Sequence, residues 1–129
     1  MRKDTENFIN SAVYDLETAE HLLRTSRYIY VVFMCHLSIE KMLKAVYAEV
    51  NEKTPPRTHN LLYLIKATGL NFSETHFEFI SKINNASVVT RYPEDFVALT
   101  ESFPEDIVSE YLQNTQEIIE WLKQNEKLS

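Results

Sequence analysis

The chain has 129 residues, of which 44% are hydrophobic and 25% charged, and its formal net charge is −6. We expect residues 1–129 to form a single domain, since a chain of this length buries roughly two-thirds of its unfolded surface. The acidic balance excludes a protein that coats nucleic acid through a general positive field, although a local basic patch stays open. The only glycine is Gly69, which argues against glycine-rich phosphate loops and dinucleotide fingerprints.

No stretch of about 18 uncharged residues occurs, and the N-terminus Met1-Arg2-Lys3-Asp4 is polar. We therefore expect a cytoplasmic protein with no membrane span or signal peptide. The only cysteine is Cys35, whose apolar neighbours predict a buried side chain rather than a nucleophile. Because the sequence has no cysteine pair, paired histidines or acidic calcium loop, we expect no metal and no other cofactor.

The first half of the chain predicts two long helices. From about Asp4 to Thr25, apolar residues recur at helical spacing. Ser26 is a candidate N-cap for a second helix that runs to about Val50. The stretch from Tyr30 to Val50 is apolar almost all the way round, which indicates the central helix of a bundle.

A third and a fourth helix are predicted after the proline pair at positions 55 and 56, which cannot continue a helix. Thr58 is a candidate N-cap for a short third helix, with Gly69 just past its end. Asn71 followed by Glu74 resembles a capping box for the fourth helix.

The helical pattern is lost between Ala86 and Phe103, where the apolar residues have no clean period and Pro93 breaks a helix. We expect an irregular but packed segment there. Ser102 and Glu105 resemble a second capping box, and a last helix with apolar residues at helical spacing follows. The expected fold is an all-α, antiparallel up-and-down bundle of about five helices.

Three charged residues, Glu40, Lys41 and Lys44, interrupt the apolar second helix. Lys44 follows Glu40 by one helical turn, so an ordinary ion pair on one helix face explains both. Alternatively, Lys41 and Lys44 present ammonium groups to a phosphate or an acidic partner, and Glu40 orients one of them. The sequence leaves both interpretations open.

His59 and Arg91 each stand in a short polar cluster outside that helix. His59 either hydrogen-bonds a neighbouring loop or exchanges a proton near pH 7. The guanidinium of Arg91 lies among apolar residues and needs a partner, for which Glu40 is the obvious intramolecular choice. Since buried charges must be compensated, we expect Glu40, Lys44, His59 and Arg91 to border one groove beside the second helix.

Four short segments follow one another along nearly the whole chain: AVYDLETA at 12–19, LSIEKMLKA at 37–45, THNL at 58–61 and TRYP at 90–93. As a set, in this order, they resemble the HEPN domain family. The resemblance implies an up-and-down helical bundle that pairs as a homodimer. It also implies a partnership with a minimal nucleotidyltransferase and, in some members, nucleotide binding.

The resemblance further implies that many relatives are metal-independent ribonucleases or toxins, with a histidine that follows an arginine after four to six intervening residues. This chain departs from that pattern, because no histidine has that spacing from any of its arginines, which are Arg2, Arg24, Arg27, Arg57 and Arg91. We therefore expect a non-catalytic module, one half of a two-gene system, that offers Lys41, Lys44, His59 and Arg91 to a nucleotide or RNA. The alternative is a metal-independent ribonuclease or toxin, in which His59 acts as acid or base and Arg91 stabilises the phosphorane charge.

Overall fold

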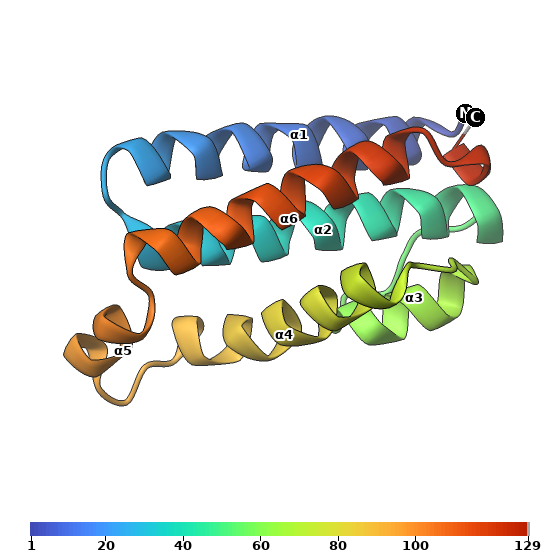
Figure 1. Cartoon of the computed structure of the whole chain (residues 1–129). Coiled ribbons are helices and arrows are strands. Elements are labelled where there is room, and N and C mark those ends of the chain that lie inside the picture. The colour runs from blue at the N-terminus through green and yellow to red at the C-terminus, as the bar shows by residue number, and fades with distance from the viewer. Residues whose placement is uncertain (129) are drawn as a thin grey trace.

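The computed structural model describes residues 1–128 and consists of helices joined by short connections (Figure 1). The helices are α1 (Lys3–Arg24), α2 (Tyr28–Asn51), α3 (Leu61–Thr68), α4 (Glu74–Arg91), α5 (Phe96–Ser102) and α6 (Glu105–Lys123), followed by a 3₁₀ turn, η1 (Glu126–Leu128). Within residues 1–128 no strand is present, so the predicted all-α class is confirmed. The short helix α5 and the 3₁₀ turn η1 are elements that the sequence pattern did not indicate.

Helix α2 is the centre of the fold. It packs against α1, α3, α4 and α6, and 15 of its 24 residues are buried. Ile39, Met42 and Leu43 are among its fully buried side chains. Burying an aliphatic side chain of this size stabilises a fold by about 1.5–3 kcal/mol. The apolar stretch that predicts a central helix therefore also contributes much of the free energy that stabilises the fold.

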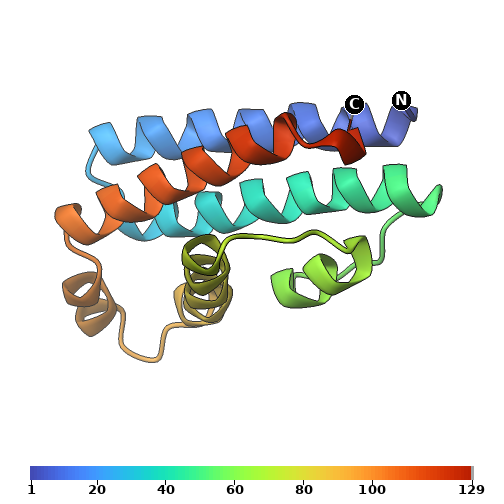
Figure 2. The same cartoon turned by 45° about the vertical axis from the view of Figure 1, so that its right-hand side comes forward.

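The remaining helices are arranged around α2. Helix α1 runs antiparallel to it, and α6 returns along both, so that the two ends of the chain lie at the same end of the bundle (Figure 1). Helix α4 crosses the other long helices and is seen almost end-on in Figure 2. The segment before α3 and the C-terminal end of α4 both contact α2, through His59 and Arg91 respectively.

The turn between α1 and α2 differs from the prediction. Ser26 does not cap the start of α2; it has a left-handed φ of 63° immediately after α1. Its N–H donates to the Leu23 carbonyl, and the N–H of Arg27 donates to the Leu22 carbonyl. This is the Schellman pattern that closes a helix C-terminus. Ser26 therefore marks the end of α1, and the predicted N-cap is wrong.

The caps of α3 and α4 lie two residues later than predicted. Asn60 rather than Thr58 caps α3, and Ser73 rather than Asn71 caps α4; each side chain accepts a hydrogen bond from the first turn of its helix. Both starts contain two capping residue types close together, and the types alone do not decide which one caps. Gly69 follows α3 with a left-handed φ of 70°, as predicted.

The stretch from Ala86 to Phe103 is helical over most of its length, so the prediction of an irregular segment is wrong there. Helix α4 continues to Arg91 and ends just before Pro93, because a residue that precedes proline is disfavoured in helical conformation. Its last turns carry the exposed side chains of Val88 and Val89. Apolar residues on the outer face obscure the inward period by which a helix is recognised.

Helix α5 follows from a cap that the sequence analysis missed. The carboxylate of Asp95 accepts a hydrogen bond from the Ala98 N–H and starts this helix. Ser102 is the last residue of α5, and Pro104 occupies the N-cap position of α6. The predicted capping box at Ser102 is therefore wrong, and α6 begins at Glu105, two residues later than that cap implies.

Two further sequence-based expectations can be compared with the fold. Among residues 1–128, no helix is both long and apolar enough to cross a membrane. Cys35 is fully buried in α2, as its neighbours predict. Burial raises the pKa of its thiol to about 12, against the opposing effect of the Thr115 hydroxyl, so Cys35 carries no thiolate at neutral pH.

Candidate functional site

The candidate site is built around Glu40, a residue of α2 that is buried and only 3% exposed. Its Oε2 accepts a hydrogen bond from Nζ of Lys44 at 3.1 Å, the ion pair that the sequence spacing indicates. Its Oε1 accepts a hydrogen bond from Nδ1 of His59 at 2.9 Å. The ring of His36 lies one turn earlier on α2, with Nδ1 3.8 Å from Oε1. These neighbours provide the compensation that a buried carboxylate requires.

His59 is held in place although its side chain is 61% exposed. A carboxylate only accepts hydrogen bonds, so Nδ1 of His59 carries the proton shared with Glu40 and Nε2 is the free ring nitrogen. On the C-terminal side of His59, Asn60 caps α3, and the side chain of Asn84 on α4 accepts a hydrogen bond from the Leu61 N–H at 2.9 Å. These bonds fasten the backbone beside His59 to two helices.

Arg91, the last residue of α4, does not pair with Glu40. Its guanidinium lies over the ring of Phe33, with the central carbon 5.0 Å from the ring centroid. Its Nε is buried and has no hydrogen-bond partner within residues 1–128. The intramolecular pairing that the sequence suggested is therefore not how this arginine is satisfied. A guanidinium with unused donors is well suited to bind a carboxylate or a phosphate.

Arg91 and His59 line the same hollow, which has a volume of about 340 Å³. The other lining side chains are those of Asn60, Asn84, Ser87, Val88 and Tyr92. The ring of Tyr92 is the most exposed of the large apolar side chains, at 78%. The hollow thus offers two cationic or proton-bearing groups, two amides and an open aromatic face.

His36 lies behind this hollow and is fully buried, and its ring makes no side-chain hydrogen bond in the part of the chain that the structure describes; its polar neighbours are the backbone of His59 and the carboxylate of Glu40. Burial lowers the pKa of His36 to about 4. The Glu40 carboxylate opposes this shift, and the positive charge of Arg91 adds to it. His36 is therefore neutral at neutral pH and adds no positive charge beside those of Arg91 and Lys44.

The stability of the protein should fall as pH decreases from about 6.5 to about 4, in part because of His36. The unfolded histidine has a pKa of about 6.5, so in this range the unfolded chain binds a proton that folded His36 does not. The full effect is roughly 3 kcal/mol. We expect urea denaturation at a series of pH values to show a steep loss of stability for the wild type and a shallower one for His36→Leu.

The control is His21→Asn, which removes an exposed histidine from α1. It should leave the pH dependence of stability unchanged, whereas equal slopes for wild type and His36→Leu would contradict the buried neutral state. Carboxylates with lowered pKa values, such as Asp4 beside Arg2, also reduce stability at low pH, and they do so equally in all three proteins.

The sequence-predicted residues are only partly brought together. Glu40, Lys44 and His59 are in direct contact, and Arg91 shares the hollow with His59. Lys41 points elsewhere: its Nζ lies 2.6 Å from Oδ2 of Asp15 on α1. Four of the five candidate residues therefore surround one place beside α2, and the fifth joins α2 to α1.

Sequence reasoning missed His36, Asn84 and Tyr92 as members of this group. His36 gives a weak signal, since it is a polar residue within an apolar helix and one turn from Glu40. Tyr92 lies beside Arg91 in the TRYP segment, but its exposure depends on where α4 ends. Asn84 gives no sequence signal, because its role comes from contact with the segment before α3.

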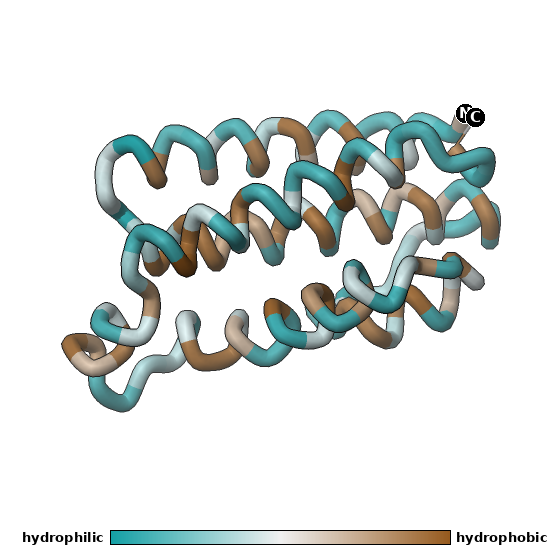
Figure 3. Tube along the Cα trace, in the orientation of Figure 1, coloured by the Kyte–Doolittle hydropathy of each residue, from teal (hydrophilic) through white to brown (hydrophobic). Residues whose placement is uncertain are grey.

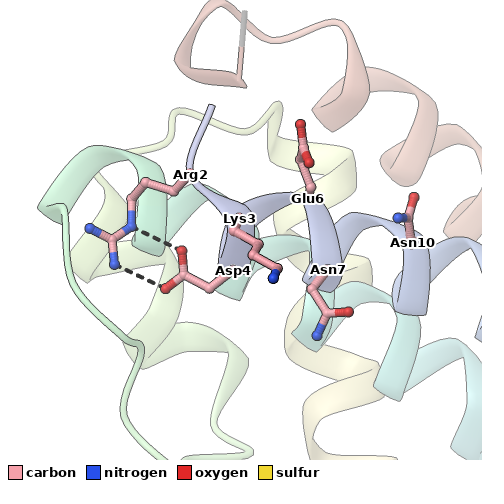
Figure 4. Close-up of a pocket in the computed structure, with 6 residues that line it drawn as sticks. All are labelled: Arg2, Lys3, Asp4, Glu6, Asn7 and Asn10. Carbon is pink, nitrogen blue, oxygen red and sulfur yellow. Dashed lines mark hydrogen bonds and ion pairs between the residues drawn. The ribbon is translucent and has the colours of Figure 1, made fainter.

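A larger hollow of about 760 Å³ lies at the start of α1, on the outside of the bundle (Figure 4). Its arginine is already occupied, since Arg2 donates to both oxygens of Asp4 at 2.9 and 3.1 Å. The side chains of Lys3, Glu6 and Asn7 point in different directions (Figure 4). Without groups that converge on one point, this hollow is not assigned as a site.

Comparisons with known proteins agree with this fold. The crystal structure of TT1696 from Thermus thermophilus has a TM-score of 0.80 at 16% identity, over 95% of this chain and 98% of that chain. The crystal structure of ST0689, an archaeal HEPN homologue, has a TM-score of 0.75 at 20% identity, over 95% of this chain and 97% of that chain. At such identities the likeness shows the fold alone.

Sequence comparison identifies the family. No curated protein matches the chain. The family model of the HEPN domain, however, matches residues 5–125, which is nearly the whole sequence. This match agrees with the four short segments that resemble the family. The chain therefore belongs to the HEPN domain family.

Proposed function

We propose that this HEPN protein is a non-catalytic module that binds a nucleotide or a short polynucleotide segment in the hollow between His59 and Arg91. The observation that carries the proposal is the guanidinium of Arg91, which lines that hollow and pairs with no carboxylate within residues 1–128. A guanidinium fork binds phosphate oxygens in pairs. His59 supplies a second polar group to the lining of the same hollow, and Glu40 holds its ring.

The rest of the hollow suits the remaining parts of a nucleotide. The open ring of Tyr92 gives a face on which a base can stack, a contact that every base is able to make. The amides of Asn60 and Asn84 supply donors and acceptors for a ribose or a base edge. The net charge of −6 does not oppose this proposal, because the ligand meets a local pair of basic side chains rather than the field of the whole chain.

Titration of the whole protein with ATP and with a single-stranded oligoribonucleotide tests the proposal. We expect saturable binding of at least one of them, and a decrease in affinity as salt rises, since phosphate contacts are screened. Chemical-shift changes should include His59, Arg91 and Tyr92. Absence of binding at millimolar concentrations of both probes would overturn the proposal.

The alternative is a metal-independent ribonuclease, and one observation favours it. The buried carboxylate of Glu40 orients His59 as a carboxylate orients the catalytic histidine of a hydrolase, and Arg91 lines the same hollow as His59. RNA degradation in the presence of chelator, lost in His59→Ala, would establish this activity. The absence of the family's arginine-to-histidine spacing favours the non-catalytic role.

Two partners belong to the proposal. The family resemblance supports a minimal nucleotidyltransferase as the other half of a two-gene toxin–antitoxin system in the cytoplasm, which co-purification of the two proteins would test.

The family resemblance also supports a homodimer, and the eleven large apolar side chains exposed on the described residues are consistent with further association. Sedimentation at micromolar concentration should show the dimer; a monomer alone would count against it.

A further inference from the structure

Helix α5 and its neighbours expose the largest group of apolar side chains on the described part of the molecule. In Figure 1, α5 projects at one end of the bundle between α4 and α6, and Figure 3 shows apolar positions on it. Six large side chains here are each more than half exposed: Tyr30 at the start of α2, Val88 and Val89 on α4, Tyr92 after it, and Phe96 and Val97 on α5. We call these six residues the α5 surface.

The α5 surface is grooved. One hollow, of about 480 Å³, runs between the end of α4 and α5 and is lined by Val88, Val89, Tyr92 and Leu99 among others. A second, of about 190 Å³, lies on the other flank of α5, between Phe96 and the start of α2. Leu99 is the only buried residue of α5. A helix of this length has little stability of its own, so a partner that covers its outer face would also stabilise it.

The segment that contains α5 carries charge of a single sign. Residues 92–122, which include α5 and most of α6, contain eight acidic residues and no lysine, arginine or histidine. The acidic residues are Glu94, Asp95, Glu101, Glu105, Asp106, Glu110, Glu117 and Glu120. The first two of them line the larger hollow directly. The grooved apolar surface is therefore bordered by negative charge along α5 and α6, whereas Arg27 lines the smaller hollow.

We propose that the α5 surface docks a basic amphipathic helix of a partner protein. The apolar face of such a helix fills the groove between α4 and α5, and its lysines and arginines lie opposite Glu94, Glu101 and the start of α6. Nucleic acid does not fit, since its phosphates meet the same negative border. A second copy that pairs symmetrically through this surface would set the two acidic borders against each other. Val88 and Tyr92 also line the hollow beside Arg91, whereas Phe96 and Val97 do not, so variants of Phe96 and Val97 test this inference apart from the proposed nucleotide site.

A synthetic peptide provides the probe. It is about 18 residues long and composed of leucine and lysine, with the leucines on one helical face. We expect it to bind the full chain in a calorimetric titration. Chemical-shift changes should centre on residues 88–102 and Tyr30, and affinity should fall with salt.

Variants and matched peptides decide the result. The double variant Phe96→Ser with Val97→Ser changes two exposed side chains and should weaken binding about tenfold or more. Glu94→Gln with Glu101→Gln should weaken it less and reduce the salt dependence. The control Val50→Ser removes an exposed valine at the opposite end of α2 and should bind as the wild type does.

Three outcomes would overturn the proposal. One is failure of the peptide to bind at millimolar concentration. Another is equal binding by a scrambled peptide of the same composition, which would show charge attraction without a groove. The third is dissociation of a homodimer by Phe96→Ser with Val97→Ser, seen by sedimentation, which would show that a second copy occupies the surface.

Discussion

Replacing Glu40 with alanine should lower the free energy of unfolding by about 3–5 kcal/mol, the usual cost of removing one partner from a buried ion pair. The two oxygens of Glu40 hold Lys44 and His59, and the carboxylate is 3% exposed. Lys44 is itself buried, so the substitution leaves its ammonium group without its acceptor. Chemical denaturation near neutral pH measures the loss.

Two comparison variants show whether the cause is the buried pair. Glu40→Gln keeps the volume and an acceptor oxygen but removes the charge, so it should lie between wild type and Glu40→Ala. Arg91→Ala should cost only about 1 kcal/mol, because the guanidinium contacts the Phe33 ring rather than Glu40. Equal losses for Glu40→Ala and Arg91→Ala would show that these two residues pair in solution, contrary to the geometry described above.

The central helix was predictable from the sequence, because the pattern that indicates it lies within a single segment. The run from Tyr30 to Val50 is apolar on every face, a pattern that only a central helix satisfies, and α2 has that position. The helix ends were less predictable. Ser26 and Thr58 are good capping residues, but the bonds that form depend on the path of the neighbouring chain.

The segment around α5 was not predictable as helix for a different reason. A periodic pattern reveals a helix when its apolar residues face inward. In this segment Val88, Phe96 and Val97 face outward, so the inward period is hidden. These outward residues belong to the α5 surface. The helical pattern is therefore hidden in the same region for which a partner is proposed.

In the candidate site, too, contacts within one helix were predictable from the sequence, and contacts between distant segments were not. The pair of Glu40 and Lys44 is local, and helical spacing alone predicts it. Lys41 follows Glu40 directly and is rotated by about 100° around the helix axis, which directs it to Asp15 on α1. His36 was overlooked because its one-turn spacing from Glu40 is a weak signal, and only the fold shows that its ring is fully buried beside that carboxylate.

Arg91→Ala should weaken binding of a nucleotide or oligoribonucleotide by about ten- to a hundredfold, the equivalent of losing charge-assisted hydrogen bonds to phosphate. Arg91 lines the hollow beside His59 and its guanidinium pairs with no carboxylate within residues 1–128, so its terminal N–H groups are available to a ligand there. Arg91→Lys should recover only part of the affinity, because lysine keeps the charge but not the planar fork. Calorimetric titration with the probe that binds the wild type measures each variant.

A matched control separates a specific contact from general electrostatics. Lys82 lies on the same helix as Arg91, is exposed, and is placed over the Tyr111 ring, outside the hollow. Lys82→Ala therefore removes one positive charge from α4 without touching the candidate site, and it should leave affinity within about twofold of the wild type. If Lys82→Ala and Arg91→Ala weakened binding equally, attraction by overall charge would explain the binding, and the hollow would lose its role. If only Arg91→Ala did so while its thermal melt stayed close to that of the wild type, the guanidinium would be identified as a ligand-binding group rather than a structural one.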